Sequence, residues 1–276
     1  MQSLAVKYHP ITATPFQNDI SYRELAPCDA LKPFIRCFWG SDAALPAQNE
    51  SHGIVIPDTC MDIIFSINYT QNNCGSFFCT LDEHSYRTNS TPDSDLVSTF
   101  AIRFYAWTAI LFSEQDFTGR KNSHFSSEEF FSQLKQRLEP MLSELPTLKE
   151  KSAAAEIFLL KMLDIHRINN DLMNAIDLML KTDGRAKISD ISFHTALSQR
   201  QLERIFNFNI GTSPKAFSSL LRYQLLWQEM IFSPSFNILD AVEKYGYTDQ
   251  AHLLRDFKSR HLMTPKNAVS YALKSR

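Results

Sequence analysis

Arginine and glutamine side chains recur at two places near the end of the chain, on segments whose apolar residues are spaced like one face of a helix. Leu202 and Phe206 are four residues apart, and so are Leu253 and Phe257. Burial of each pair turns the polar side chains between them toward other faces of the helix. Arginine can bind the edge of guanine through two hydrogen bonds, and glutamine can bind adenine in the same way. The side chains available for such contacts are Gln199, Arg200, Glu203 and Arg204 in the first segment and Gln250, His252 and Arg255 in the second.

Both segments belong to a unit that occurs twice. Each copy has the pattern of a short helix, a tight turn and a second helix, which is the helix-turn-helix arrangement. In the second copy Gly246 stands where the chain must turn sharply, a role that suits glycine because it lacks a Cβ atom. The corresponding residues are Ile188, Asp190, Leu202, Arg204, Phe206, Gly211, Ser213 and Pro214 in the first copy and Ile238, Asp240, Leu253, Arg255, Phe257, Leu262, Thr264 and Pro265 in the second.

Each of these polar side chains also has a plainer interpretation. A polar side chain on a helix surface is usually only solvated. Arg204 and Arg255 could instead form ion pairs with Asp190 and Asp240 of the preceding helices. The repetition of the whole unit is therefore stronger evidence for base reading than any one of its side chains.

A single long helix is predicted between the two copies. Ser213 is its expected cap, Pro214 lies in its first turn, and it ends near Phe232. Its 19 residues span roughly 28 Å at about 1.5 Å per residue. Successive major-groove faces on one side of B-DNA are about 34 Å apart. A rigid helix of this length could therefore hold two reading helices in adjacent turns of the groove.

Positive charge is concentrated in the last third of the chain. The 276 residues carry a formal net charge of −2. Residues 181–276 contain 14 Lys and Arg against 8 Asp and Glu, a net of +6, which leaves −8 for residues 1–180. This asymmetry suggests a polyanion-binding module joined to an acidic partner domain.

The C-terminal pattern resembles the DNA-binding region of the AraC/XylS transcriptional regulators. The resemblance rests on SQRQLERIF followed by GTSP, a connecting helix, and GYTDQAHLLRDFKSRHLMTP, and it covers residues 170–276 or so. It implies an all-helical domain with recognition helices near residues 198–206 and 249–257. Position by position, it places base or backbone contacts on Gln199, Arg200, Glu203 and Arg204, then on Gln250, Ala251, His252 and Arg255.

Four residues depart from the family pattern. Ala196 replaces the usual glycine of the first turn, and Leu262 replaces the glycine before the closing Thr-Pro. Ser192 and Val242 stand where a small alanine is usual. We expect Ala196 to strain its turn and Leu262 to alter the entry into the last helix, which affects the geometry of the domain more than DNA binding as such.

Residues 1–122 are expected to form a β-rich, cupin-like sensor domain. β-Like runs occur at IVIPDTCMDIIFSINY, GSFFCTL and LVSTFAIRFY, with NNCG and TPDSD as loops. The segments LKPFIRCFW, PDTCMDIIF and FAIRF resemble the sensor-type domain of part of the same family, with Thr59 in place of a glycine. That resemblance implies a pocket for an effector of unknown identity. Asp58, Asp62 and Arg103 could line it, although capping of backbone amides is the more ordinary role for a turn carboxylate such as Asp58.

Residues 123–168 are expected to form a helical linker before the DNA-binding domain at residues 169–276, which makes the fold class α+β. The first linker helix has Ser126 three residues before Glu129, the spacing of a capping box, and Pro140 interrupts it. The linker could pass a signal, form a dimer contact, or simply pack on the barrel. The helices predicted in this part of the chain lie at residues 126–138, 153–166 and 171–182.

Two other functions are open for the N-terminal half. A cupin-like barrel could hold a catalytic metal through clustered histidines, and some AraC-like proteins carry a zinc-bound cluster of four cysteines. The histidines are isolated, no nucleophile elbow or P-loop appears, and the cysteines do not form two close pairs. We therefore predict no catalysis, cofactor or metal, and reduced thiols. The residues concerned are His9, His52, His84, His124, Cys28, Cys37, Cys60, Cys74 and Cys79.

The sequence predicts a regulator that works in the cytoplasm. We expect no secretory signal and no membrane span, because the longest apolar run, residues 104–112, has nine residues and a spanning helix needs about 20. The expected function is sequence-specific DNA binding for transcription regulation. The expected partners are double-stranded operator DNA, RNA polymerase, a small-molecule effector or a protein at the N-terminal half, and a second copy in a homodimer.

Overall fold

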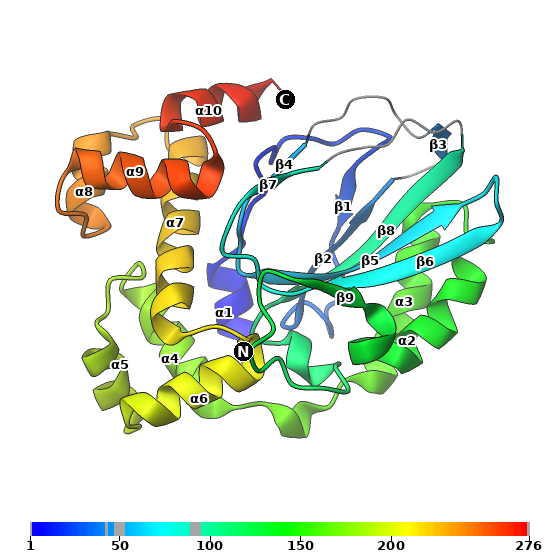
Figure 1. Ribbon diagram of the computed structural model, residues 1–276, viewed down its shortest axis with the longest axis horizontal. Helices are drawn as coiled ribbons and strands as arrows, with labels where there is room; N and C mark the ends of the chain where they lie inside the picture. Colours follow the sequence, from blue (N-terminus) through cyan, green and yellow to red (C-terminus); the bar gives the residue numbers. More distant parts are fainter. Residues whose placement is uncertain (1, 42–43, 47–52, 89–94, 275–276) are drawn as a thin grey trace.

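The N-terminal half is built around one antiparallel sheet. The computed structural model describes residues 2–41, 44–46, 53–88 and 95–274. The strand order is β1-β2-β8-β5-β6-β9, β3 pairs with β8, and β4 and β7 form a separate two-stranded sheet (Figure 1). The strands are β1 (Arg23–Leu25), β2 (Ile35–Gly40), β3 (Leu45–Pro46), β4 (Ile54–Val55), β5 (Cys60–Asn68), β6 (Asn73–Cys79), β7 (Tyr86–Arg87), β8 (Leu96–Tyr105) and β9 (His124–Ser126).

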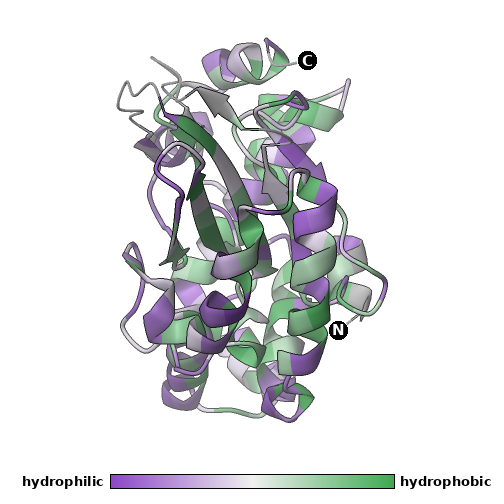
Figure 2. Cartoon of the chain, turned by 90° about the vertical axis from the view of Figure 1, so that its right-hand side faces the viewer, coloured by the Kyte–Doolittle hydropathy of each residue, from purple (hydrophilic) through white to green (hydrophobic). Residues whose placement is uncertain are grey.

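Two helices cover the hydrophobic face of this sheet. β5 and β8 pair along nearly their full lengths, which places Phe65 opposite Phe100, and both side chains are fully buried. α2 (Ser127–Leu142) packs against β5, β6 and β9, and α3 (Leu148–Met162) packs against α2, β1 and β2. Figure 2 shows hydrophobic residues along the long strands and hydrophilic ones on the outer turns of the helices. The helical stretch therefore packs on the sheet, and its roles in signal transmission and in a dimer contact stay predictions.

The first of these helices differs from its prediction at both ends. α2 continues through Pro140 to Leu142, because the side chains of Leu138 and Leu142 are fully buried and this burial outweighs the one backbone hydrogen bond that proline cannot donate. Ser126 does cap α2, but its hydroxyl accepts from the backbone N–H of Glu128 at 3.3 Å. The predicted interruption and the predicted capping box were both wrong.

Two further boundaries moved. α3 begins at Leu148, earlier than predicted, because Thr147 and Glu150 form a capping box: the Thr147 hydroxyl accepts from the Glu150 N–H at 3.2 Å, and the Glu150 carboxylate accepts from the Thr147 N–H at 3.0 Å. β6 begins at Asn73, so most of the predicted NNCG loop is strand. The predicted TPDSD loop, residues 91–95, lies mostly outside the described residues.

The C-terminal half is all-helical and follows the predicted repeat, which confirms the α+β class. Ser198, Ser213 and Thr264 each cap a helix through a side-chain oxygen that accepts a backbone N–H. Gly246 turns with a φ of 66° between α8 and α9. The helices are α4 (Asn170–Lys181), α5 (Ile188–Thr195), α6 (Gln199–Ile210), α7 (Pro214–Phe232), α8 (Ile238–Lys244), α9 (Gln250–His261) and α10 (Pro265–Leu273).

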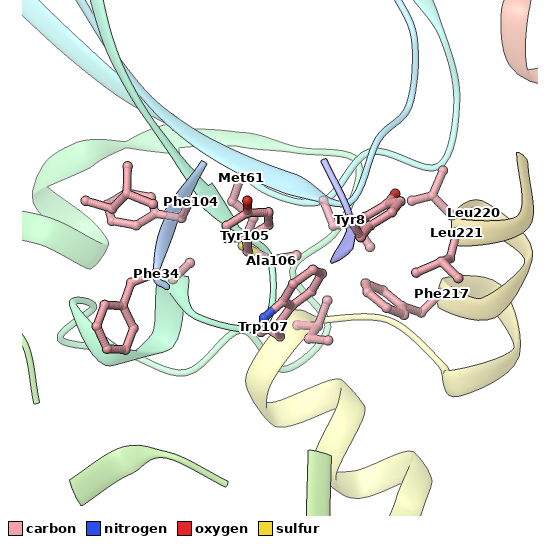
Figure 3. Packing of buried hydrophobic residues seen from close by; sticks show 14 of the residues in the cluster. Tyr8, Phe34, Met61, Phe104, Tyr105, Ala106, Trp107, Phe217, Leu220 and Leu221 are labelled. Atoms are coloured by element: carbon pink, nitrogen blue, oxygen red, sulfur yellow. The ribbon is translucent and has the colours of Figure 1, made fainter. Parts of the chain in front are cut away.

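One hydrophobic core runs from the sheet into α7. Figure 3 shows Tyr8, which follows the short helix α1 (Gln2–Lys7), and Trp107 between the end of β8 and side chains of α7. The rings of Trp107 and Phe217 meet edge to face, with centroids 6.1 Å apart. Tyr8, Trp107 and Phe217 are at most 2% exposed. The two halves are therefore packed as one body.

Hydrogen bonds fasten α7 to the N-terminal segment as well. The fully buried amide of Gln224 accepts from the backbone N–H of Ile11 at 3.0 Å and donates to the carbonyl of Pro57 at 2.9 Å. The indole N–H of Trp227 donates to the carbonyl of Thr12 at 3.0 Å. These bonds satisfy the backbone N–H of Ile11 and the carbonyls of Thr12 and Pro57 at this contact.

The two departures at family glycine positions both adopt the left-handed backbone conformation, Ala196 with a φ of 54° and Leu262 with a φ of 57°. Because a side chain is strained there, Ala196→Gly and Leu262→Gly are each expected to raise the free energy of unfolding by about 0.5 to 1 kcal/mol. Urea denaturation measures this change. Ala153→Gly, at an exposed site in α3, is the control and should lower stability by about 0.5 to 1 kcal/mol. A lower free energy of unfolding in both Ala196→Gly and Leu262→Gly would contradict backbone strain at these two positions.

Candidate nucleic-acid interface

The two helix-turn-helix units lie at opposite ends of α7. Figure 1 shows α5 and α6 at one end and α8 and α9 at the other, with α5 and α8 on the side of α7 away from the sheet. α5 contacts α6, α8 contacts α9, and α10 packs on α9. α7 is one uninterrupted helix of 19 residues, or roughly 28 Å at about 1.5 Å per residue. The spacing that the sequence predicted for the two units is thus set by a single helix.

The predicted contact residues occupy the first turns of α6 and α9. Leu202 and Phe206 in α6, and Leu253 and Phe257 in α9, are fully buried, as the apolar spacing predicted. Of the candidates, only His252 is half-buried, and its ring meets Tyr247 edge to face at 5.3 Å. The exposed candidates are Gln199, Arg200, Glu203, Arg204, Gln250, Ala251 and Arg255.

The three arginines proposed to contact DNA are not paired with the neighbouring carboxylates. Within the described residues, Arg200, Arg204 and Arg255 form no ion pair with an Asp or Glu side chain. The carboxylate of Asp190 instead accepts from the backbone N–H of Lys187 at 3.3 Å. The three guanidinium groups are therefore available to an external anion or base edge.

A polar network that the sequence analysis did not single out braces the second unit. The hydroxyl of Tyr247 donates to the carboxylate of Asp256 at 2.8 Å, and the guanidinium of Arg222 lies 4.6 Å from the centre of the Tyr247 ring. Asp256 also pairs with Arg260, whose guanidinium donates to the hydroxyl of Ser219 at 2.9 Å. The network ties the turn before α9 to α7, and only the tyrosine of the GYTDQ motif gave a signal of it in the sequence.

The last turn of α9 ends in a buried histidine. The ring of His261 is fully buried and stacks on Phe257 with centroids 4.9 Å apart, and its Nδ1 lies 2.7 Å from the hydroxyl of Tyr223. The other ring nitrogen, Nε2, has no hydrogen-bond partner among the described residues. Burial lowers the pKa of His261 to about 4. The neutral ring is therefore the form that holds α9 against α7.

This burial predicts a loss of stability in acid. The pKa of His261 in the folded chain, about 4, lies below its ordinary value of about 6.5, so the stabilisation is complete above pH 6.5 and is lost as the pH falls toward 4. Between pH 7 and 5 the loss is about 2 kcal/mol, measured by urea denaturation. His261→Phe should remove this part of the pH dependence, whereas His194→Phe, at an exposed histidine in α5, should leave it. Equal slopes in the wild type and His261→Phe would contradict the assignment.

Three predicted residues of the sensor half lie together at the sheet, with Asp62 on β5, Arg103 on β8 and Asp58 just before β5. The guanidinium of Arg103 donates to the carboxylate of Asp62 at 2.9 Å and lies 3.8 Å from Asp58. Trp39 also donates its indole N–H to Asp62 at 2.7 Å. Asp58 accepts the backbone N–H of Cys60 at 2.7 Å, which is the capping role expected of a turn carboxylate. Burial raises the pKa of Asp58, and the positive charge of Arg103 opposes this rise.

The comparison with protein-family models decides what the two units are. Residues 191–269 match a model described as a helix-turn-helix domain. The chain therefore carries an AraC-type helix-turn-helix domain and is a DNA-binding transcription regulator. Residues 23–126 of the regulator match a domain of unknown function (DUF6597), which covers the sheet. A comparison with curated proteins found no match to this regulator.

Several solved structures are similar to parts of the regulator. A transcriptional regulator with an AraC-type DNA-binding domain from Chromobacterium violaceum is 24% identical over 37% of this chain and 92% of its own, with a TM-score of 0.35. An apo ToxT variant from Vibrio cholerae is 12% identical over 85% of this chain and 97% of its own, with a TM-score of 0.43. The C-terminal domain of the response regulator yesN from Fusobacterium nucleatum is 19% identical over 37% of this chain and 99% of its own, with a TM-score of 0.34.

The described part of the regulator contains no cluster of three His, Cys, Asp or Glu side chains that could hold a metal ion. All five cysteines are free thiols, and His52 lies outside the described residues. Burial raises the pKa of Cys37 and Cys79, which keeps these two thiols protonated. Among the described helices, none is long and apolar enough to span a membrane.

Proposed function

We propose that α6 and α9 of one chain read base edges in two successive major-groove turns of an operator. The observation that carries this proposal is the repetition of an exposed arginine without a carboxylate partner, Arg204 in the first unit and Arg255 in the second. Such an arginine can bind guanine through two hydrogen bonds. The other proposed base or backbone contacts are Gln199, Arg200, Glu203, Gln250, Ala251 and His252.

Alanine variants of the two arginines test base reading. Arg204→Ala and Arg255→Ala are each expected to weaken operator binding by about 1 to 3 kcal/mol and to relax the sequence preference at one position. Fluorescence anisotropy with the operator and with random duplex measures both effects. Arg137→Ala removes an exposed arginine from α2, far along the chain from the units, and should leave binding unchanged. An equal loss on operator and random duplex would show that the side chain contacts phosphate instead.

We also infer that the N-terminal half controls the DNA-binding half. It is acidic, and it shares a core with α7 through Trp107 and Phe217, so a small molecule or a protein bound there could change the placement of both units. A thermal-shift screen of metabolites on the full chain tests the small-molecule form. A rise in melting temperature for one compound, with altered operator affinity, is the expected result, and the absence of any such compound would favour a protein contact.

The remaining features follow from this role. We infer a cytoplasmic protein with no enzymatic activity, no cofactor and a contact to RNA polymerase.

Ile157 and Leu160 are 55% and 46% exposed on α3, and their spacing places both on one face of the helix. This apolar face is consistent with a homodimer in which α3 contacts its copy. Sedimentation of the full chain and of Ile157→Ser would test that contact.

A further inference from the structure

We propose that a loop of the N-terminal half forms part of the DNA interface, by holding phosphates of the strand beside α6. The loop comprises residues 117–121, and we name it the Gly119 loop. The inference rests on the proposed function, because it needs α6 in a major groove. It adds a surface outside the helix-turn-helix domain and a contact that does not depend on sequence.

The Gly119 loop is fixed to the first reading helix. The backbone N–H of Phe117 donates to the carbonyl of Phe208 at 3.0 Å, and the N–H of Gly119 donates to the side-chain carbonyl of Asn207 at 3.1 Å. Gly211, at the end of α6, has a φ of 81°, and a Cβ atom there would lie 2.5 Å from the carbonyl oxygen of Arg120. Only glycine allows this approach. The loop therefore needs no ordering when DNA binds, which avoids an entropic cost of association.

A cleft separates this loop from the base-reading side of α6. Its volume is about 600 Å³, and Gly119 and Lys121 line one side while residues of α6 line the other. The charged side chains in its walls are Lys121, Arg200, Arg204 and Glu203, three cations against one anion. The cleft therefore suits a polyanion better than a cation or an apolar ligand.

The dimensions of DNA place a strand in this position. An α-helix with its side chains is about 10 to 12 Å wide, and the major groove is about 12 Å wide. A helix in the groove therefore has a phosphate strand against each flank. The cleft lies along one flank of α6, so the strand on that side would run between α6 and the Gly119 loop.

Two cations of the loop lie beside the expected strand: Lys121 lines the cleft itself, whereas Arg120 lies next to it with its guanidinium 4.9 Å from the centre of the Phe125 ring. The side chains of Arg120 and Lys121 are 45% and 42% exposed. They now pair with Glu129 at 3.2 Å and Glu83 at 3.0 Å. The pair of Arg120 with Glu129 is exposed on both sides and stabilises the fold little. Glu83 is 17% exposed, but its carboxylate also accepts from the hydroxyl of Thr212 and keeps that bond when Lys121 turns away. Phosphates can therefore replace the carboxylates with little loss.

The salt dependence of binding tests the proposal. The double variant Arg120→Ala/Lys121→Ala should lose affinity by the same factor on operator and random duplex. The slope of log affinity against log salt should fall in magnitude by about 1 to 2, since each phosphate contact contributes about 0.9. The variant Arg120→Lys/Lys121→Arg keeps both charges and should keep the slope. Anisotropy titrations of the full chain over a range of salt concentrations measure this slope for the wild type and for both double variants.

A matched control separates the loop from a general change of charge. Lys135→Ala/Arg137→Ala removes two positive charges and one ion pair, Lys135 with Glu128, from α2, and it should leave the slope unchanged. An unchanged slope in the loop variant would overturn the proposal, and so would tighter binding, because the loop would then block DNA. These results leave the proposed function intact if Arg204→Ala still loses sequence preference. Failure of the wild type to prefer any duplex would instead remove the proposed function.

Discussion

Replacing Trp227 by alanine is expected to lower the free energy of unfolding of the whole chain by about 3 to 5 kcal/mol. The side chain is fully buried in α7, its ring centroid lies 4.5 Å from that of His261 in α9, and its N–H donates to the carbonyl of Thr12. Alanine would leave a large cavity between three parts of the chain and an unpaired carbonyl in the N-terminal segment. Urea denaturation followed by circular dichroism measures the loss.

Phe193→Ala is the control for this experiment. Phe193 is an aromatic residue of α5 that is 91% exposed, so its removal should change stability by no more than about 0.5 kcal/mol. If the two halves share one core, Trp227→Ala should also unfold in a single transition. A loss below about 1 kcal/mol, or separate transitions for the sheet and the helices, would contradict the shared core.

The DNA-binding half could be predicted almost completely from the sequence, because its signals are local. Caps such as Ser213 and Pro214 mark where a helix begins, and apolar pairs at a spacing of four mark the buried face of each reading helix. The family glycine positions predicted strain at Ala196, whose φ is positive, and the structure has the same left-handed backbone at Leu262, where an altered helix entry was predicted. The exposure of the candidate contact residues other than His252 follows from the same spacing. Their contacts with DNA stay a prediction.

The contacts between the two halves could not be predicted, because they join residues far apart in the chain. Nothing in the sequence near Gln224 indicates that its amide pairs with Ile11 and Pro57, more than 160 residues away. The burial of His261 and the fit of Gly211 against Arg120 also depend on tertiary packing alone. For the same reason Pro140 lies within α2, where sheet packing prevails over local preference.

The shared core gives a physical route for regulation. The second unit is joined to the N-terminal half through the carbonyl of Arg260, which accepts from the hydroxyl of Ser85, and the first unit through Phe208 and Phe117. A change of conformation in the sheet would therefore reach both reading helices together.

The most direct test of the account is the spacing of the two recognised segments. An operator selected from a random pool of duplexes is lengthened by five or by ten base pairs between the segments that α6 and α9 protect in footprinting. Because α7 fixes the distance between the units, both insertions are expected to weaken binding by about a hundredfold or more, as several mismatched base pairs at about 1 to 3 kcal/mol each would do. The five-pair insertion also turns one segment to the opposite side of the duplex. Full affinity for the ten-pair operator, or for both, would contradict the claim that one chain reads two adjacent turns of the groove.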